Sequence, residues 1–320
     1  MTQKEGKKKN KALRILLKIV GGIAIAIVLF IAIVYIVNVI SNKTDQKKIE
    51  TYGQLVPVDG KKMNVTILGE GEETIVLLPG FGTAAPAIDF KPLIEELAPY
   101  YRVAVVEPFG YGLSDMTDKE RNTANIVSEV HEALQALKID RYILMGHSIA
   151  GIYGIDYVNK YENEVIAFAG IDSSVPTQPG MDVKFDTGKL KLLRESGFGR
   201  LLLKIGGSAY DGLPYDDKTK EQLQLITLRN AYTSNYLNEM VNIYPNFQAA
   251  QHLTFPKELP LIFFIQANNP AISTWVPLHE EQIKDSVHGK VITMDGDHYL
   301  HHTKSKEIAE EFRAFMNGIK

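Results

Sequence analysis

Hydrophobic residues are distributed unevenly along this chain of 320 residues. The segment Ile19 to Asn42 contains no charged residue, and the run 23–40 is almost wholly aliphatic. At about 1.5 Å per residue, a helix of this length can cross a hydrocarbon core roughly 30 Å thick. Beyond it, short aliphatic runs alternate with amphipathic segments. The pattern predicts a transmembrane helix at 19–42, followed by a folded domain in which strands and helices alternate.

The aliphatic runs of this domain predict strands, and the amphipathic segments predict helices. Two strands are predicted within 55–65, around an Asp-Gly turn, and others at 74–78, 102–106, 142–145, 165–171, 261–265 and 291–294. Helices are predicted at 89–97, 125–137, 151–161 and 306–316. This alternation is typical of parallel βαβ units with helices on both faces of the sheet. Residues 174–256 lack clear strand signals, and their leucines and tyrosines predict a helical insertion.

Charge divides the chain at the same place as hydrophobicity. The first 50 residues carry ten Lys or Arg and three Asp or Glu, a charge of +7, whereas the remainder carries −10. Because positive flanks stay on the cytoplasmic side, we expect a basic cytoplasmic tail at 1–18 and a single-pass signal anchor in the cell membrane. A polar tether at 43–51 then leads to an extracytoplasmic domain at 52–320. The rival interpretation is a cleaved signal peptide, but 37–42 offers no good small-x-small cleavage site.

Composition excludes several kinds of chemistry. The chain has no cysteine, which excludes disulfides, thiolate metal sites and a cysteine nucleophile. The acidic domain should be repelled by phosphate backbones, so we expect no nucleic-acid partner. About 270 residues remain after the N-terminal segment, enough for one α/β domain with an inserted subdomain.

The segment 146–151, Gly-His-Ser-Ile-Ala-Gly, lies where a predicted strand turns directly into a predicted helix. A serine between small residues at such a turn is the pattern of a nucleophile elbow. Gly146 and Ala150 avoid a collision across the tight turn, and the helix N-terminus directs free N–H groups at the reacting centre. The segment resembles the α/β-hydrolase family, whose common form is Gly-His-Ser-x-Gly-Gly. Ser148 is therefore the candidate nucleophile.

The resemblance covers roughly residues 53–318. It is strong at the elbow, the Pro-Gly-Phe-Gly loop at 79–82, the turn at 107–115 and the histidine at 298. It implies a mostly parallel α/β-hydrolase sheet flanked by helices, with a variable lid at about 174–256 covering the site. We interpret the turn at 107–115, with Glu107 in the acidic place, as structural.

A serine hydroxyl needs a base, and the base needs an orienting acceptor. His298 follows the last predicted strand, where the family places its histidine; the alternative is a lone surface histidine. The usual place of the acid, a turn at 267–270, holds no carboxylate. Asp172 ends the strand after the elbow, so it should emerge beside Ser148 at the carboxyl edge of the sheet. The alternative is that Asn268 or Asn269 orients His298; Asp297 is discounted because adjacent side chains rarely face each other.

Two backbone N–H groups are predicted to bind the oxyanion. One belongs to Ile149, directly after the nucleophile, and the other to Phe81 in the loop after strand 74–78. His301 and His302 follow His298 closely, so these three histidines could be mistaken for a set of metal ligands. No second set of ligands accompanies them, and we expect neither a metal nor a cofactor.

Together these features predict a membrane-anchored serine hydrolase that cleaves an ester, thioester, lactone or small amide through an acyl-enzyme. Its partners would be a small acyl substrate and the membrane. One alternative is a peptidase of the proline-iminopeptidase type, which would need a lid carboxylate placed to hold a free amine. The other is a non-catalytic hydrolase-like module that binds a ligand under its lid.

Overall fold

The computed structural model describes residues 2–207 and 210–319. The chain divides into two compact units. One contains residues 1–48 and 188–207, and the other contains 49–187 and 208–320. The larger unit holds every strand and all the predicted site residues.

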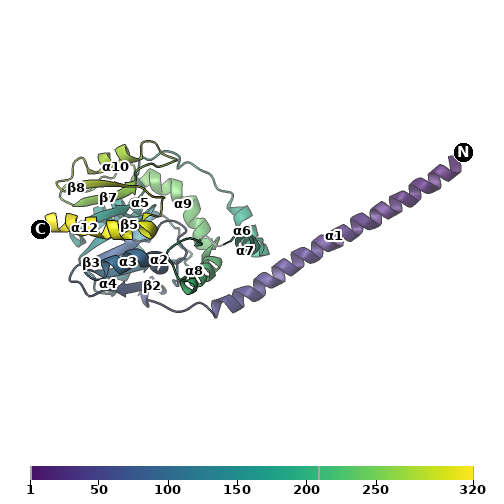
Figure 1. Cartoon of the computed structure of the whole chain (residues 1–320), viewed down its shortest axis with the longest axis horizontal. Coiled ribbons are helices and arrows are strands. Elements are labelled where there is room, and N and C mark those ends of the chain that lie inside the picture. Colours follow the sequence, from purple (N-terminus) through teal and green to yellow (C-terminus); the bar gives the residue numbers. More distant parts are fainter. Residues whose placement is uncertain (1, 208–209, 320) are drawn as a thin grey trace. The chain divides into compact units, whose positions relative to one another are not determined.

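The larger unit is built on a sheet flanked by helices (Figure 1), with eight strands in the order β1-β2-β4-β3-β5-β6-β7-β8. The strands are β1 Gln54–Val58, β2 Lys61–Leu68, β3 Thr74–Leu78, β4 Arg102–Glu107, β5 Tyr142–His147, β6 Val165–Ile171, β7 Leu261–Gln266 and β8 Gly289–Met294. β2 pairs antiparallel with β1 and β4, and every other neighbouring pair is parallel. The predicted, mostly parallel sheet is therefore confirmed, and its carboxyl edge carries the ends of β3, β5, β6 and β7.

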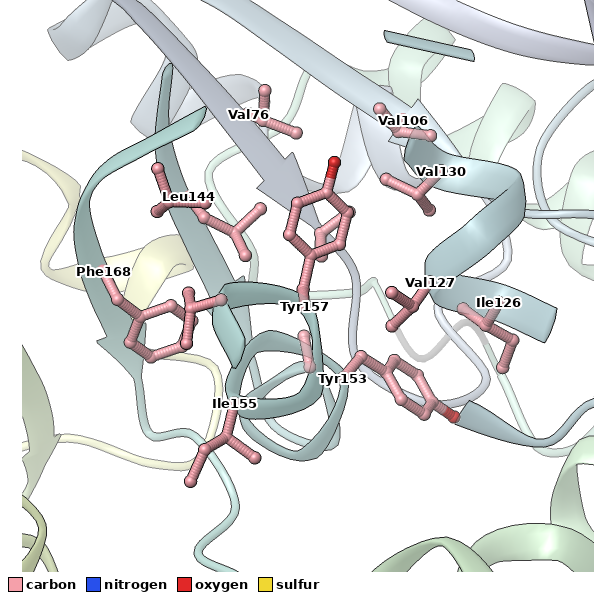
Figure 2. Close-up of a cluster of buried hydrophobic side chains, with 14 of the residues drawn as sticks. Val76, Val106, Ile126, Val127, Val130, Leu144, Tyr153, Ile155, Tyr157 and Phe168 are labelled. Atoms are coloured by element: carbon pink, nitrogen blue, oxygen red, sulfur yellow. The ribbon is translucent and has the colours of Figure 1, made fainter. Parts of the chain in front are cut away.

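Alternate residues of the central strands belong to two different hydrophobic clusters, one on each face of the sheet. In β3, Val76 and Leu78 join one cluster, whereas Ile75 and Leu77 join the other. The first face is covered by α4 (Thr123–Ala136) and α5 (Ala150–Lys160), whose packed side chains Figure 2 shows. The second face is covered by α3 (Lys91–Leu97) and α12 (Ser305–Gly318). Burial on both faces explains why these strands are continuous aliphatic runs.

Between β6 and β7 the described chain contains helices and no strand, as the sequence pattern suggests. They are α6 Thr187–Ser196, α7 Phe198–Ile205, α8 Asp217–Asn230 and α9 Ser234–Ala250. Three short helices were not predicted: α2 Pro86–Asp89 as a separate element, α10 Trp275–Ile283 and α11 Leu300–Thr303. A single turn η1 (Glu162–Glu164) precedes β6.

The smaller unit is dominated by α1, a continuous helix over Thr2–Gln46. Its segment Leu13–Gln46 is long and apolar enough to cross a membrane, a property shared with signal sequences. The helix also includes 43–46, the first four residues of the segment predicted as a tether. The helix continues because neither glycine nor proline interrupts it there.

Candidate active site

Ser148 lies at a strained turn between β5 and α5. Its φ angle is +55°, in the left-handed region that residues other than glycine rarely adopt. A Cβ atom at Gly146 would lie 2.8 Å from Cβ of Ala150. That contact is too short for a carbon pair, so the turn requires a residue without a side chain at 146. The local geometry is the tight strand-to-helix turn that the sequence predicts.

His298 lies between Ser148 and Asp172. Its Nε2 atom is 2.9 Å from Oγ of Ser148, and its Nδ1 atom is 2.7 Å from Oδ2 of Asp172. These residues come from the end of β5, the end of β6 and the loop after β8. The structure thus brings together three side chains that are up to 150 residues apart in sequence.

Asp172 is fully buried, and its carboxylate accepts hydrogen bonds from two protein groups besides its contact with His298. Oδ1 accepts hydrogen bonds from the backbone N–H of Gln266, at 2.9 Å, and from Nε1 of Trp275, at 2.7 Å. These two donors leave Oδ2 facing His298. Trp275 is buried beside Asp172, and no local pattern in the sequence pointed to this contact.

Asn268 and Asn269, the alternatives to Asp172 for orienting His298, lie in different environments. Oδ1 of Asn269 accepts from the backbone N–H groups of Ala271 and Ile272, both at 2.9 Å. Asn268 is exposed. Oδ1 of Asp297 accepts from the N–H of Tyr299 at 3.0 Å and so closes a local turn. It is Asp172, among these candidates, whose oxygen lies within hydrogen-bond distance of the imidazole.

The loop after β3 approaches the elbow very closely. A Cβ atom at Gly80 would lie 2.6 Å from Nδ1 of His147 and 3.0 Å from Cβ of Ser148. Gly80 therefore lets the backbone on either side of Phe81 reach Ser148. Among the hydrogen bonds of the described residues, none is donated by the N–H of Phe81 or Ile149.

A network that the sequence did not predict supports the same loop. The N–H of Gly82 donates to the hydroxyl of Tyr111 at 3.3 Å, and Tyr111 donates to Oε2 of Glu239 at 2.8 Å. The hydroxyl of Tyr153 donates to Oε1 of Glu239 at 2.7 Å. Burial raises the pKa of the Glu239 carboxyl, which lies on α9 with both oxygens occupied. The network ties the inserted segment to the candidate oxyanion loop.

The remaining histidines near the site hold the loop that carries His298. Nε2 of His147 lies 2.9 Å from the carbonyl oxygen of His298. Burial, followed by neighbouring His301 and His298, holds the pKa of His147 well below its usual range, so the neutral ring donates this bond through Nε2–H. His301 and His302 place their Nε2 atoms 2.8 and 3.0 Å from the two oxygens of Asp89.

Asp89 is thereby a shared hydrogen-bond acceptor that fastens α11 to α2. Burial alone would raise the pKa of Asp89, but the hydrogen bonds from His301 and His302 more than offset it, and the pKa lies below its usual range. These contacts explain why two histidines follow His298 in sequence without touching Ser148.

The turn after β4 is held by buried Glu107. Its oxygens accept from the amide of Asn64 at 2.9 Å, the hydroxyl of Tyr52 at 2.8 Å and the N–H of Leu113 at 2.8 Å. A Cβ atom at Gly112 would collide with this carboxylate, so the glycine is required. These contacts are internal to the protein and agree with the interpretation of this turn as structural.

A surface groove of about 490 Å³ lies elsewhere in the same unit. Its lining includes Glu50, Tyr52, Lys91 and Asp216 but none of the three residues around the elbow. Its walls combine charged residues with apolar ones such as Leu68 and Ile94, and Lys91 and Asp216 pair with each other across 3.4 Å. The size of a hollow alone therefore does not select the candidate site.

Comparisons with known proteins agree with this fold. An uncharacterized protein of Bacillus subtilis, YbdG, is 30% identical over 265 residues, covering 79% of this chain and 80% of that protein. The epoxide hydrolase VrEH1 of Vigna radiata superposes with a TM-score of 0.63 at 18% identity, covering 83% of this chain and 97% of its own. A membrane phospholipase A, described as a bacterial virulence factor, gives 0.61 at 18% identity, covering 96% and 98%. The family model of the α/β hydrolases matches residues 75–311, and the chain belongs to that family.

Proposed function

We propose that this hydrolase is a membrane-anchored serine hydrolase that cleaves an ester, thioester, lactone or small amide through an acyl-enzyme. The observation that carries the proposal is the line of hydrogen bonds from Ser148 through His298 to buried Asp172, at 2.9 and 2.7 Å. A hydroxyl, an imidazole and a carboxylate in this order form the relay that acyl transfer requires.

In the acylation step, Oγ of Ser148 attacks the carbonyl carbon of the substrate while Nε2 of His298 accepts the hydroxyl proton. The C=O electron pair moves to oxygen, and the N–H groups of Phe81 and Ile149 stabilise the resulting oxyanion. When the intermediate collapses, the bond to the leaving group breaks and His298 protonates that group. Asp172 holds the imidazole through Nδ1 and stabilises its positive charge.

In the deacylation step, water replaces Ser148 as the attacking group, and Ser148 becomes the leaving group. His298 takes a proton from water, the hydroxide oxygen attacks the acyl carbon, and the second intermediate expels Oγ of Ser148, which regains its proton. The acid product leaves with the new oxygen. No cofactor is needed for this cycle, because each proton released is accepted and returned by the same imidazole.

The peptidase alternative needs a lid carboxylate that holds a free amine. The buried acid of the inserted segment, Glu239, accepts from Tyr111 and Tyr153 instead. Its carboxylate thus has protein partners on both oxygens, and we retain acyl-ester chemistry as the proposal. The half-buried rings of Phe81 and Tyr236, 4.7 Å apart between centroids, favour an apolar acyl group beside the loop.

The membrane part of the proposal rests on α1 and its flanks. Its apolar surface is almost entirely exposed, which suits a lipid environment better than water. Seven basic residues precede the predicted span within 1–18, and they favour a cytoplasmic N-terminus and an extracytoplasmic hydrolase domain.

Labelling with a fluorophosphonate probe tests the chemistry directly. We expect the full-length protein in detergent to be labelled and Ser148→Ala to be unlabelled with an unchanged thermal midpoint. Asp172→Asn should keep the fold and lower turnover by about 10⁴-fold, because the imidazole loses its orienting charge. A folded wild-type protein that never reacts with the probe would rule out the serine mechanism and favour a non-catalytic binding module.

Carbonate extraction and protease accessibility test the anchor. We expect the protein to remain with membranes after carbonate washing, and the hydrolase domain to be degraded by protease added outside intact cells stripped of their wall. Release of the protein by carbonate would contradict the anchor without bearing on the chemistry.

A further inference from the structure

The smaller unit contains an unusual partner for a membrane-spanning helix. The helical hairpin α6–α7 packs against the C-terminal half of α1, where it buries Val34 and Asn38 while most of α1 stays exposed. At the hairpin turn, Gly197 has a φ of +86°, and a Cβ atom there would lie 2.6 Å from Cβ of Asn38. The ring of Phe198 lies 6.0 Å from that of Phe30, between centroids.

Arg200 of α7 fixes this contact. Although charged, it is only 8% exposed. Its Nε donates to Oδ1 of Asn38 at 3.1 Å, its Nη2 to Oδ1 of Asn42 at 2.5 Å, and its Nη1 pairs with Asp45. The three partners are spaced four and three residues apart and therefore share one face of α1. The ion pair neutralises a charge that would otherwise be costly next to a bilayer.

The opposite side of the hairpin presents large apolar side chains to the surroundings. Leu192, Leu202 and Ile205 are 64%, 57% and 74% exposed. The segment 187–207 also carries five basic residues and one acidic residue, a charge of +4 within a domain that is otherwise strongly acidic. Exposed leucines on a short helix with basic neighbours are typical of helices that lie in a membrane interface.

We propose that the α6–α7 hairpin inserts into the outer leaflet beside the anchor, with its exposed leucines among phospholipid acyl chains and its exposed lysines at the phosphate headgroups. The inference rests on the anchor part of the proposed function. Val34, whose carbonyl oxygen would lie 2.9 Å from a Cβ atom at Gly197, is eight residues before Asn42, the predicted outer end of the span. At 1.5 Å per residue this depth is about 12 Å, within the outer half of a hydrocarbon core roughly 30 Å thick.

The consequence for the enzyme follows from chain order. The hairpin interrupts the segment between β6 and β7, far from α1 in sequence. If it is held in the leaflet, the hydrolase domain is attached to the bilayer through two separate stretches of chain, one of them part of the segment predicted as a lid.

The chain has no cysteine, so single-cysteine variants can be made without first replacing native cysteines, which makes a depth measurement straightforward. Leu202→Cys and Ile205→Cys report on the hairpin, Ile27→Cys on the aliphatic run of the anchor, and Val287→Cys on an exposed apolar position of the larger unit. Each full-length variant would be labelled with a polarity-sensitive fluorophore and reconstituted in phosphatidylcholine–phosphatidylglycerol vesicles with and without doxyl-labelled lipid. The thermal midpoint in detergent checks the fold of each variant.

We expect fluorescence at 202 and 205 to be lost on adding doxyl lipid to an extent comparable with 27, while 287 is unaffected. Quenching at 27 without quenching at 202 and 205 would overturn the hairpin inference and leave the anchor intact. A blue-shifted but unquenched signal at 202 and 205 would also overturn it and indicate that a second copy of the chain covers the leucines. Absence of quenching at 27 would instead overturn the anchor, and the hairpin inference with it.

Discussion

The indole nitrogen of Trp275 lies 2.7 Å from Oδ1 of Asp172 and donates to the carboxylate whose other oxygen faces His298. Trp275 is the only tryptophan of the chain, and its ring is buried. In the proposed relay it is a positioning residue, since it touches neither the nucleophile nor the base. Its hydrogen bond fixes the rotation of a carboxylate that must present Oδ2 to the imidazole.

Replacing this donor should therefore impair turnover more than binding. For Trp275→Phe we expect kcat on a soluble ester to fall by roughly tenfold, the equivalent of one lost hydrogen bond to a charged group, with KM little changed. Asn269→Ala is the matched control, because Asn269 closes its own turn and should leave kcat near the wild-type value. A large effect of Asn269→Ala with none of Trp275→Phe would return the orienting role to the asparagine.

The second prediction concerns the close approach of Gly80 to the elbow. The added Cβ of Gly80→Ala would meet His147 and Ser148 and displace the loop that carries the Phe81 N–H. Losing one oxyanion donor should lower kcat by about 10²- to 10³-fold. Gly318→Ala has open space around its added carbon and should retain full activity. Steady-state kinetics of the two variants make the comparison, and equal activities would remove Phe81 from the oxyanion role.

A third prediction follows from the path Gly82–Tyr111–Glu239. Tyr111→Phe and Glu239→Gln should each lower kcat by roughly five- to tenfold, because each loosens the same support of the loop. The double variant should be little worse than either single one, since residues in one network are not additive. Tyr153 donates to Glu239 but does not contact the loop, so Tyr153→Phe should lower the thermal midpoint more than kcat. Additive effects on kcat would separate Glu239 from Tyr111.

The fourth prediction concerns stability in acid. Burial lowers the pKa of both His147 and His301 below the ordinary value of 6.5, so the folded state keeps them neutral. Below about pH 6.5 the unfolded chain binds protons that the folded chain does not, and the free energy of unfolding should fall by up to about 1.4 kcal/mol per pH unit for each group. The lowered pKa of Asp89 adds a further loss below about pH 4.

Urea unfolding of the full-length protein in detergent, followed by the fluorescence of Trp275, measures this dependence. His301→Gln can still donate to Asp89 and should reduce the slope between pH 6.5 and 5. The exposed His288→Gln should leave it unchanged. A slope that is the same in all three proteins would show that these buried imidazoles do not govern acid stability.

Most of the sheet could be predicted because its signals are local. The strand at 165–171 was predicted with the boundaries that the structure gives, and the aliphatic run of 74–78 matches β3. Helix α10 was missed because its nine residues show no clear apolar periodicity; buried Trp275 and His279 stabilise it through contacts with Asp172 and Ser173.

The sequence alone was sufficient for the elbow and for the alternation of strand and helix. Both depend on interactions within a few residues: the steric conflict between positions 146 and 150, and the burial of continuous aliphatic runs. The tertiary structure decided which acid faces His298, which residues support the loop of Phe81, and what contacts the C-terminal end of α1. Those pairings join residues 29 to 162 positions apart. They depend on strand order and on the docking of inserted helices, which no local pattern encodes.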